Sequence, residues 1–151
     1  MNEMLGNQYF LARKYSLAHE EFEKSLKANP NNINVKKKLV VCYTQIGKII
    51  KAKELFFDLI SENINYILET DPLVDDCPCP DLIARLESDL SVNEGSYEYH
   101  VALGIIWLYC DSGNSLKYFI EARKLNPNDS LLEQIVNILF LHQNKINKTK
   151  R

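Results

Sequence analysis

The feature of this 151-residue chain that most constrains its fold is an internal repeat with a period of 34 residues. Four residues near the N-terminus recur with the same identity 34 positions later. They are Leu5, Tyr9, Ala18 and Phe22, followed by Leu39, Tyr43, Ala52 and Phe56. Within each copy, Leu and Tyr lie four residues apart, as do Ala and Phe, so each pair shares one helix face. The pattern predicts two helices per copy, joined by a short turn.

The sizes of the repeated residues suit close helix packing. Two antiparallel helices can approach closely only where a small side chain lies at the contact, and Gly6, Ala18 and Ala52 meet that need. Large aromatic residues are expected to fill the adjacent space. We therefore predict burial of Tyr9, Phe22, Tyr43 and Phe56.

A third copy follows at an offset of 97 residues from the first, which is two periods plus an insertion of 29. It is recognised by Tyr118-Phe119, Ala122 and Asn126-Pro127-Asn128, and its first helix carries Leu103-Gly104 and Trp107. Leu103 and Phe119 are 16 residues apart, whereas Leu5 and Phe22 are 17 apart. This difference predicts a tighter turn at Cys110 to Asn114.

These spacings resemble those of the tetratricopeptide repeat, a 34-residue unit with Leu-Gly, Tyr, Ala, Phe and Pro at the same positions. The departures are Ile64, where the second unit lacks the proline, and Ser115, where the third unit lacks the alanine. The resemblance implies an all-α, right-handed superhelix forming a single domain over residues 1–151. Its expected parts are units at about 1–32, 33–66 and 96–129, an insertion at about 67–95, and a C-terminal helix at about 130–143.

Charge sets the insertion apart from the repeats. Residues 1–60 carry a net charge of +4, residues 61–95 carry −8, and residues 96–151 carry +2. The insertion holds Pro72, Pro78 and Pro80, which interrupt helices, and one helical stripe predicted over Asp81 to Leu90. One hypothesis is that this acidic segment lies across its own positive repeat pair.

The predicted C-terminal helix is apolar on nearly every side, although the last helix of a solenoid normally has a polar outer face. This favours a homodimer or another partner at that helix, and the alternative is that the insertion covers it.

Composition and motifs give no indication of a catalytic or metal-binding function. No catalytic residue, metal site or cofactor is expected, because the glycines are too dispersed for a phosphate loop and His19 lacks the second histidine of a zinc helix. His19 is expected to be exposed. With no basic field and a longest apolar run of only ten residues, neither nucleic acid nor membrane is an expected partner, and the protein is expected to be cytoplasmic.

The alternative function rests on Cys77 and Cys79, which are separated by one proline. Two such thiols could bind a soft metal or act in redox chemistry, although the neighbouring aspartates would raise their pKa values. A structural turn is the competing interpretation.

The resemblance further implies that the first helix of each unit lines a concave groove for a peptide or partner helix. The expected partner-binding residues are Asn7, Phe10, Asn34, Lys37, Val41, Thr44 and Gln45. Chaperone adaptors of the family grip a peptide's terminal carboxylate with a set of Lys, Asn and Arg side chains. Asn7 matches that set, but Glu3 replaces a lysine and Lys38 an asparagine, so binding of a heat-shock chaperone is not expected. The lysines beside Asn7 still favour an acidic ligand. The expected function is non-catalytic protein binding or scaffolding, or that of an accessory subunit in an assembly.

Overall fold

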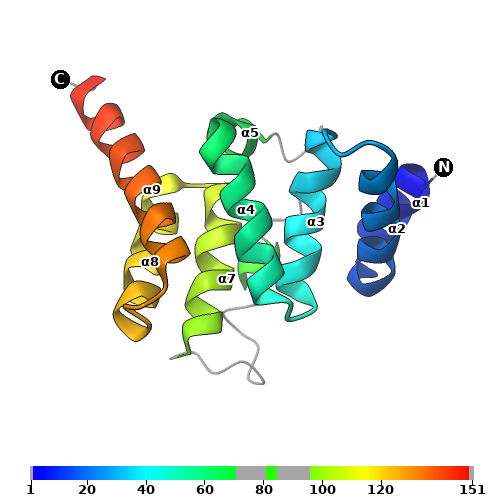
Figure 1. Cartoon of the computed structure of the whole chain (residues 1–151), viewed down its shortest axis with the longest axis horizontal. Coiled ribbons are helices and arrows are strands. Elements are labelled where there is room, and N and C mark those ends of the chain that lie inside the picture. The colour runs from blue at the N-terminus through cyan, green and yellow to red at the C-terminus, as the bar shows by residue number, and fades with distance from the viewer. Residues whose placement is uncertain (1, 71–80, 85–95, 150–151) are drawn as a thin grey trace. The chain divides into compact units, whose positions relative to one another are not determined.

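A computed structural model describes residues 2–70, 81–84 and 96–149, and these residues form helices and turns with no strand (Figure 1). The all-α fold class is thereby confirmed. The described residues fall into two compact units, one with residues 2–66 and 70, the other with residues 67–69, 81–84 and 96–149. The division falls within the segment whose acidic, proline-rich composition predicts a connector.

The first unit consists of two helical hairpins. Its helices are α1 (Asn2–Leu11), α2 (Tyr15–Ala28), α3 (Ile33–Gln45) and α4 (Ile49–Asn63). The residues of the short helix α5 (Asn65–Leu68) are divided between the two units. Along the chain, α1 packs against α2, α2 against α3, and α3 against α4 (Figure 1). Two helices per 34-residue copy, as the repeat predicts, are therefore present.

The second unit contains the third copy and the C-terminal helix. Its helices are α7 (Tyr97–Leu108), α8 (Ser112–Leu125) and α9 (Ser130–Thr149), with α8 packed against both others. Helix α9 runs past the predicted end near residue 143, because the polar residues that follow include no proline or glycine to stop it. Of the helix predicted at Asp81 to Leu90, residues 81–84 are helical, with Leu82 and Ile83 buried, and the remainder lies outside the described residues.

Helix boundaries follow the sequence repeat. The second helix of each copy begins at residue 15, 49 or 112, which reproduces the offsets of 34 and 97. Asn29 and Asn126 end their helices with nearly the same backbone angles, φ −141° and ψ 86° against φ −142° and ψ 78°. The side chains of Asn32 and Asp129 then cap the following helices by accepting from Val35 N and Leu132 N. Local conformation therefore repeats together with sequence.

The core of each unit contains the small and large residues predicted to interlock. A Cβ built on Gly6 would lie 2.7 Å from the Phe22 ring, and one on Gly104 would lie 2.8 Å from the Phe119 ring. Both rings are fully buried, as are Phe56, Ala18 and Ala52. Tyr43 is buried and Tyr9 is half-buried. The predicted close approach is confirmed by two glycine–phenylalanine contacts.

The third copy makes the same contact with one residue fewer. Helix α7 ends four residues after Gly104, whereas α1 ends five residues after Gly6. Ser115, which replaces the alanine of the other copies, is fully buried, and its hydroxyl donates to the Gly104 carbonyl at 2.6 Å. The serine fits a close contact because its extra polar atom has a partner.

The turns inside the first two copies have one left-handed residue each. Among the described residues, Arg13 with φ 63° and Gly47 with φ 79° are those with positive φ, and they are 34 positions apart. The following amides donate to equivalent carbonyls, Lys14 N to Tyr9 O at 2.8 Å and Lys48 N to Tyr43 O at 2.9 Å. This is the helix end that glycine normally terminates. Arg13 therefore occupies a conformation that suits glycine better.

Exchanging these two residue types should change stability in opposite directions. We expect Arg13→Gly to raise, and Gly47→Ala to lower, the free energy of unfolding by about 1 kcal/mol each, since a side chain at positive φ is strained. No atom lies within 4 Å of a Cβ built at Gly47, so the loss of stability in Gly47→Ala would report backbone strain and not a clash. Urea unfolding measures both changes, and a shift in the same direction for the two variants would contradict the shared geometry.

Candidate functional site

The seven residues predicted to bind a partner do not form one accessible row. Phe10, Val41, Thr44 and Lys37 are buried, with Lys37 only 8% exposed. Asn7 and Gln45 are half-buried, and Asn34 is exposed. In the second unit, Val101, Ile105 and Leu108 of the corresponding helix are fully buried. Partner binding at these residues stays a prediction, and Asn34, Asn7 and Gln45 offer most of the accessible surface.

The buried members have structural roles within the first unit. The Phe10 ring packs edge-on against Tyr15 at 5.8 Å and against Phe22 at 6.2 Å between centroids. The Thr44 hydroxyl donates to the Val41 carbonyl at 2.6 Å, which satisfies it inside its own helix. Phe10 is therefore part of the aromatic core, and Thr44 presents little free hydrogen-bonding capacity.

One polar cluster joins α1 to α3. The Lys38 ammonium donates to Asn7 Oδ1 at 3.0 Å and lies 5.8 Å from the centroid of the Phe10 ring. Beside it, Asn32 Nδ2 donates to Glu3 Oε2 at 3.1 Å. Lys38 has no carboxylate within salt-bridge distance among the described residues. The structure thus brings Asn7 together with Lys38, and the positive charge there is not neutralised by an ion pair.

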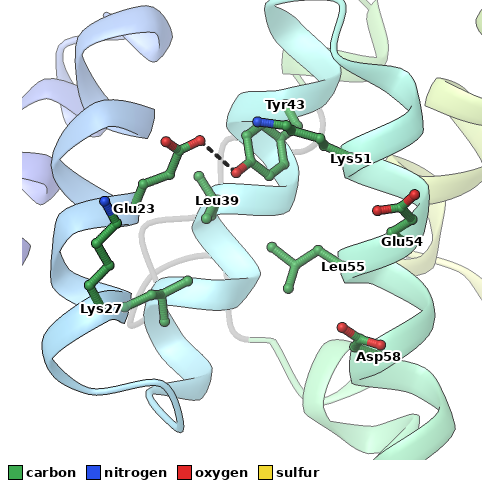
Figure 2. A pocket seen from close by; sticks show the side chains of 9 residues that line it. Glu23, Lys27, Leu39, Tyr43, Lys51, Glu54, Leu55 and Asp58 are labelled. Atoms are coloured by element: carbon green, nitrogen blue, oxygen red, sulfur yellow. Dashed lines mark hydrogen bonds between the residues drawn. The ribbon is translucent and has the colours of Figure 1, made fainter.

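A separate hollow of about 380 Å³ opens between α2, α3 and α4 (Figure 2). Each helix contributes residues one turn apart on a single face. The lining residues are Glu23, Leu26 and Lys27 from α2, Leu39 and Tyr43 from α3, and Lys51, Glu54, Leu55 and Asp58 from α4. Leucines form its floor and charged side chains form its rim, with the α2 charges on one side and the α4 charges on the other (Figure 2).

None of the seven predicted residues lines this hollow. On α3, Leu39 is two positions from Lys37 and Tyr43 is two positions from Val41, so each is turned by about 200° around the helix. The hollow is therefore on the opposite side of α3 from Lys37 and Val41. The spacing of Leu39 and Tyr43 was visible in the sequence, but it identifies a buried face and not the neighbouring helices that border it.

A hydrogen bond fixes the wall of the hollow. The Tyr43 hydroxyl donates to Glu23 Oε1 at 2.7 Å, and the Lys51 ammonium lies 5.9 Å from the Tyr43 ring centroid. Burial, followed by the Glu23 carboxylate, raises the pKa of Tyr43 well above its usual range. His19 was expected to be exposed, and this prediction is wrong: its side chain is buried, with only 8% exposed. Its face of α2 lies toward α3, and its ring is 6.2 Å from that of Tyr43.

The described thiols are poor nucleophiles in this environment. Burial raises the pKa of Cys42 to about 12, and partial burial with the charge of Asp111 raises the pKa of the exposed Cys110. Among residues 2–70, 81–84 and 96–149, no group of three or more His, Cys, Asp or Glu side chains could hold a metal ion. Cys77 and Cys79 lie outside the described residues.

The buried thiol should make the fold sensitive to alkali. Unfolded Cys42 loses its proton near pH 9.0, whereas the folded thiol keeps it until about pH 12, so stability is lost as the pH rises across this range. We expect Cys42→Ala to flatten the fall in the free energy of unfolding above pH 9, measured by urea titration in reductant.

The same change at the exposed Cys110 is the comparison and should leave more of that fall in place. Identical pH profiles for wild type and Cys42→Ala would contradict the assignment. Tyr43 should preserve part of the alkaline loss in every variant, because its pKa is also raised.

The exposed surface of helix α9 is less apolar than its sequence predicts, because several of its apolar side chains are buried. Leu132, Ile135, Val136 and Leu139 are buried, while Phe140 and Leu141 are 53% and 61% exposed. A homodimer or partner contact through this helix stays a prediction. Within the part of the chain that the structure describes, no helix is both long and apolar enough to span a membrane.

Comparison with known proteins adds no assignment. No protein-family model matches the sequence, and no curated protein matches it either. Function must therefore be inferred from the chain itself.

Proposed function

We propose that the chain is a non-catalytic protein-binding module built as a tetratricopeptide-like superhelix of helical hairpins. The observation that carries the proposal is the repetition of one hairpin geometry. The left-handed turn residue recurs after 34 positions, and the glycine–phenylalanine contact recurs in the third copy. Stacked hairpins of this kind present extended surfaces whose common use is binding peptides and helices. Since one fold can serve several functions, the surface itself must support the inference.

The surface that supports it lies between α1 and α3. Lys38 is held by Asn7 and by the face of the Phe10 ring, so its ammonium is oriented by the fold. A fixed cation without a neutralising carboxylate favours an acidic group of a peptide. Asn34, which is exposed on the first turn of α3, extends the polar surface toward a bound segment. We infer that an acidic peptide or partner segment binds here.

Charge removal at Lys38 tests this function. We expect Lys38→Gln to weaken binding of a fluorescein-labelled peptide ending in several Asp and Glu residues by about three- to tenfold, because one partly desolvated charge pair is lost. Fluorescence anisotropy measures the affinity. Lys48→Gln is the matched control, since it removes the same charge from an exposed position at the start of α4.

Lys38 is half-buried and Lys48 is exposed, so thermal unfolding should be nearly unchanged in both variants. Equal weakening by Lys38→Gln and Lys48→Gln would show that net charge alone attracts the peptide and would defeat the site. Absence of any binding by the wild-type chain would do the same.

A further inference from the structure

The hollow between α2, α3 and α4 has the anatomy of a small protein interface. Its floor is apolar, with Leu39 only 2% exposed and Leu26 and Leu55 half-buried. Its rim is charged and solvent-accessible, with Lys27, Lys51, Glu54 and Asp58 all exposed. An apolar centre surrounded by a polar rim is the arrangement found where a partner inserts an anchoring side chain. The hollow is open to solvent, so it suits a protruding side chain better than an enclosed small molecule.

The sign of the rim favours a basic partner. Three carboxylates, those of Glu23, Glu54 and Asp58, face two ammonium groups. One of these, Lys51, already lies over the Tyr43 ring. Among the described residues, neither Glu54 nor Asp58 has a cation within salt-bridge distance. The α4 side of the hollow therefore carries two carboxylates that no described side chain neutralises.

The spacing of these carboxylates identifies the form of the partner. Glu54 and Asp58 are four residues apart on α4, which places them about one helical turn, or roughly 5 to 6 Å, from each other. Basic side chains spaced one turn apart on a second helix would match both. Leucine-sized side chains on the adjacent face of that helix would then meet the floor formed by Leu26, Leu39 and Leu55.

We propose that this hollow is a second docking site, which binds a basic amphipathic helix of a partner protein. An apolar side chain of that helix enters the leucine floor, and its Arg or Lys residues pair with Glu54 and Asp58. The Tyr43–Glu23 hydrogen bond holds the opposite wall in place. This inference rests on the proposed protein-binding function but concerns a different part of the α3 surface from the Lys38 cluster, and its ligand has the opposite charge.

A synthetic helix tests the proposal on the full chain. The probe is a fluorescein-labelled 14-residue peptide of Leu, Ala and Arg, with leucines on one face and arginines flanking them. We expect measurable binding by anisotropy at low salt, and a three- to tenfold loss of affinity in the double variant Glu54→Gln/Asp58→Asn, consistent with two exposed ion pairs. Both positions are exposed, so the variant should fold normally.

Three comparisons make the result decisive. Glu20→Gln/Glu98→Gln removes the same charge from exposed positions outside the hollow and should leave the affinity unchanged. A probe with glutamates in place of arginines, and one with alanines in place of leucines, should both bind at least tenfold more weakly. The site is disproved if the wild-type chain does not bind the probe, if the control variant weakens binding equally, or if either altered probe binds as well.

These outcomes are separable from those of the Lys38 test, because the acidic peptide used there is repelled by Glu54 and Asp58. If the wild-type chain binds the acidic peptide but not the basic helix, the second site is overturned and the proposed function is left intact. Failure of both probes would overturn both.

Discussion

Replacing Phe22 or Phe119 with alanine is expected to lower the free energy of unfolding by about 3 to 5 kcal/mol. Both rings are fully buried, and each lies directly against a glycine of the preceding helix. A glycine has no side chain that could move into the vacated space, so most of the cavity should persist. Urea unfolding followed by circular dichroism measures the loss, and each variant reports on the unit that contains it.

Exposed leucines on the same helices provide the control. Leu17 on α2 is 43% exposed and Leu125 on α8 is 50% exposed, so alanine at either position should cost about 1 kcal/mol or less. A loss at Phe22 or Phe119 no larger than at these leucines would mean that the rings do not form the core of their hairpins.

The hairpins could be predicted from the sequence because they depend on local spacing and side-chain size. Ala18 and Phe22 recur 34 residues later as Ala52 and Phe56, so each pair is expected to make the same contact between two helices. The burial of all four could therefore be predicted. The burial of His19 could not be predicted in this way. A lone histidine has no partner pattern, and its location depends on how α2 packs against α3.

The accessible surface was harder to predict than the core. Residues 39–44 of α3 are all buried, although a single helix face accounts for only some of them. Periodicity in one segment shows that one face is apolar, but it does not show how many sides neighbouring elements cover. For this reason Val41 and Thr44 were expected in a groove. The left-handed conformation of Arg13 could not be predicted from the sequence either. Arg13 has the same conformation as Gly47, but only the second copy has a glycine at this position to indicate it.

The two proposed surfaces follow from one helix with distinct sides. Lys38 points its charge toward Asn7 on α1, whereas Tyr43 donates to Glu23 on α2. Under the two proposals, the first contact orients Lys38 for an acidic ligand, and the second holds one wall of the hollow proposed for a basic helix. Because α3 packs against a different neighbour at each place, the two proposed sites can be formed on one helix without sharing the same surface.

The glycine contacts give the second large effect, and its sign is informative. Alanine is the better helix former by about 1 kcal/mol, so Gly6→Ala and Gly104→Ala should stabilise a helix considered alone. In this fold the new methyl group would lie 2.7 Å or 2.8 Å from a buried aromatic ring, closer than carbon atoms can approach. Overpacking of this kind typically costs about 1 to 3 kcal/mol. We therefore expect both variants to lose stability in urea unfolding, despite the gain in helix propensity.

Gly113→Ala separates these two contributions. It also lies in the second unit, in the first turn of α8, but its nearest neighbour would be the flexible amide of Gln143 at an ordinary 3.4 Å. Alanine there should be neutral or stabilising by up to about 1 kcal/mol. Combining Gly6→Ala with Phe22→Leu should cost less than the sum of the single changes, because the smaller side chain leaves room for the added methyl group. Strict additivity would mean that Gly6 and Phe22 act independently, and the close approach of α1 and α2 would then need a different cause.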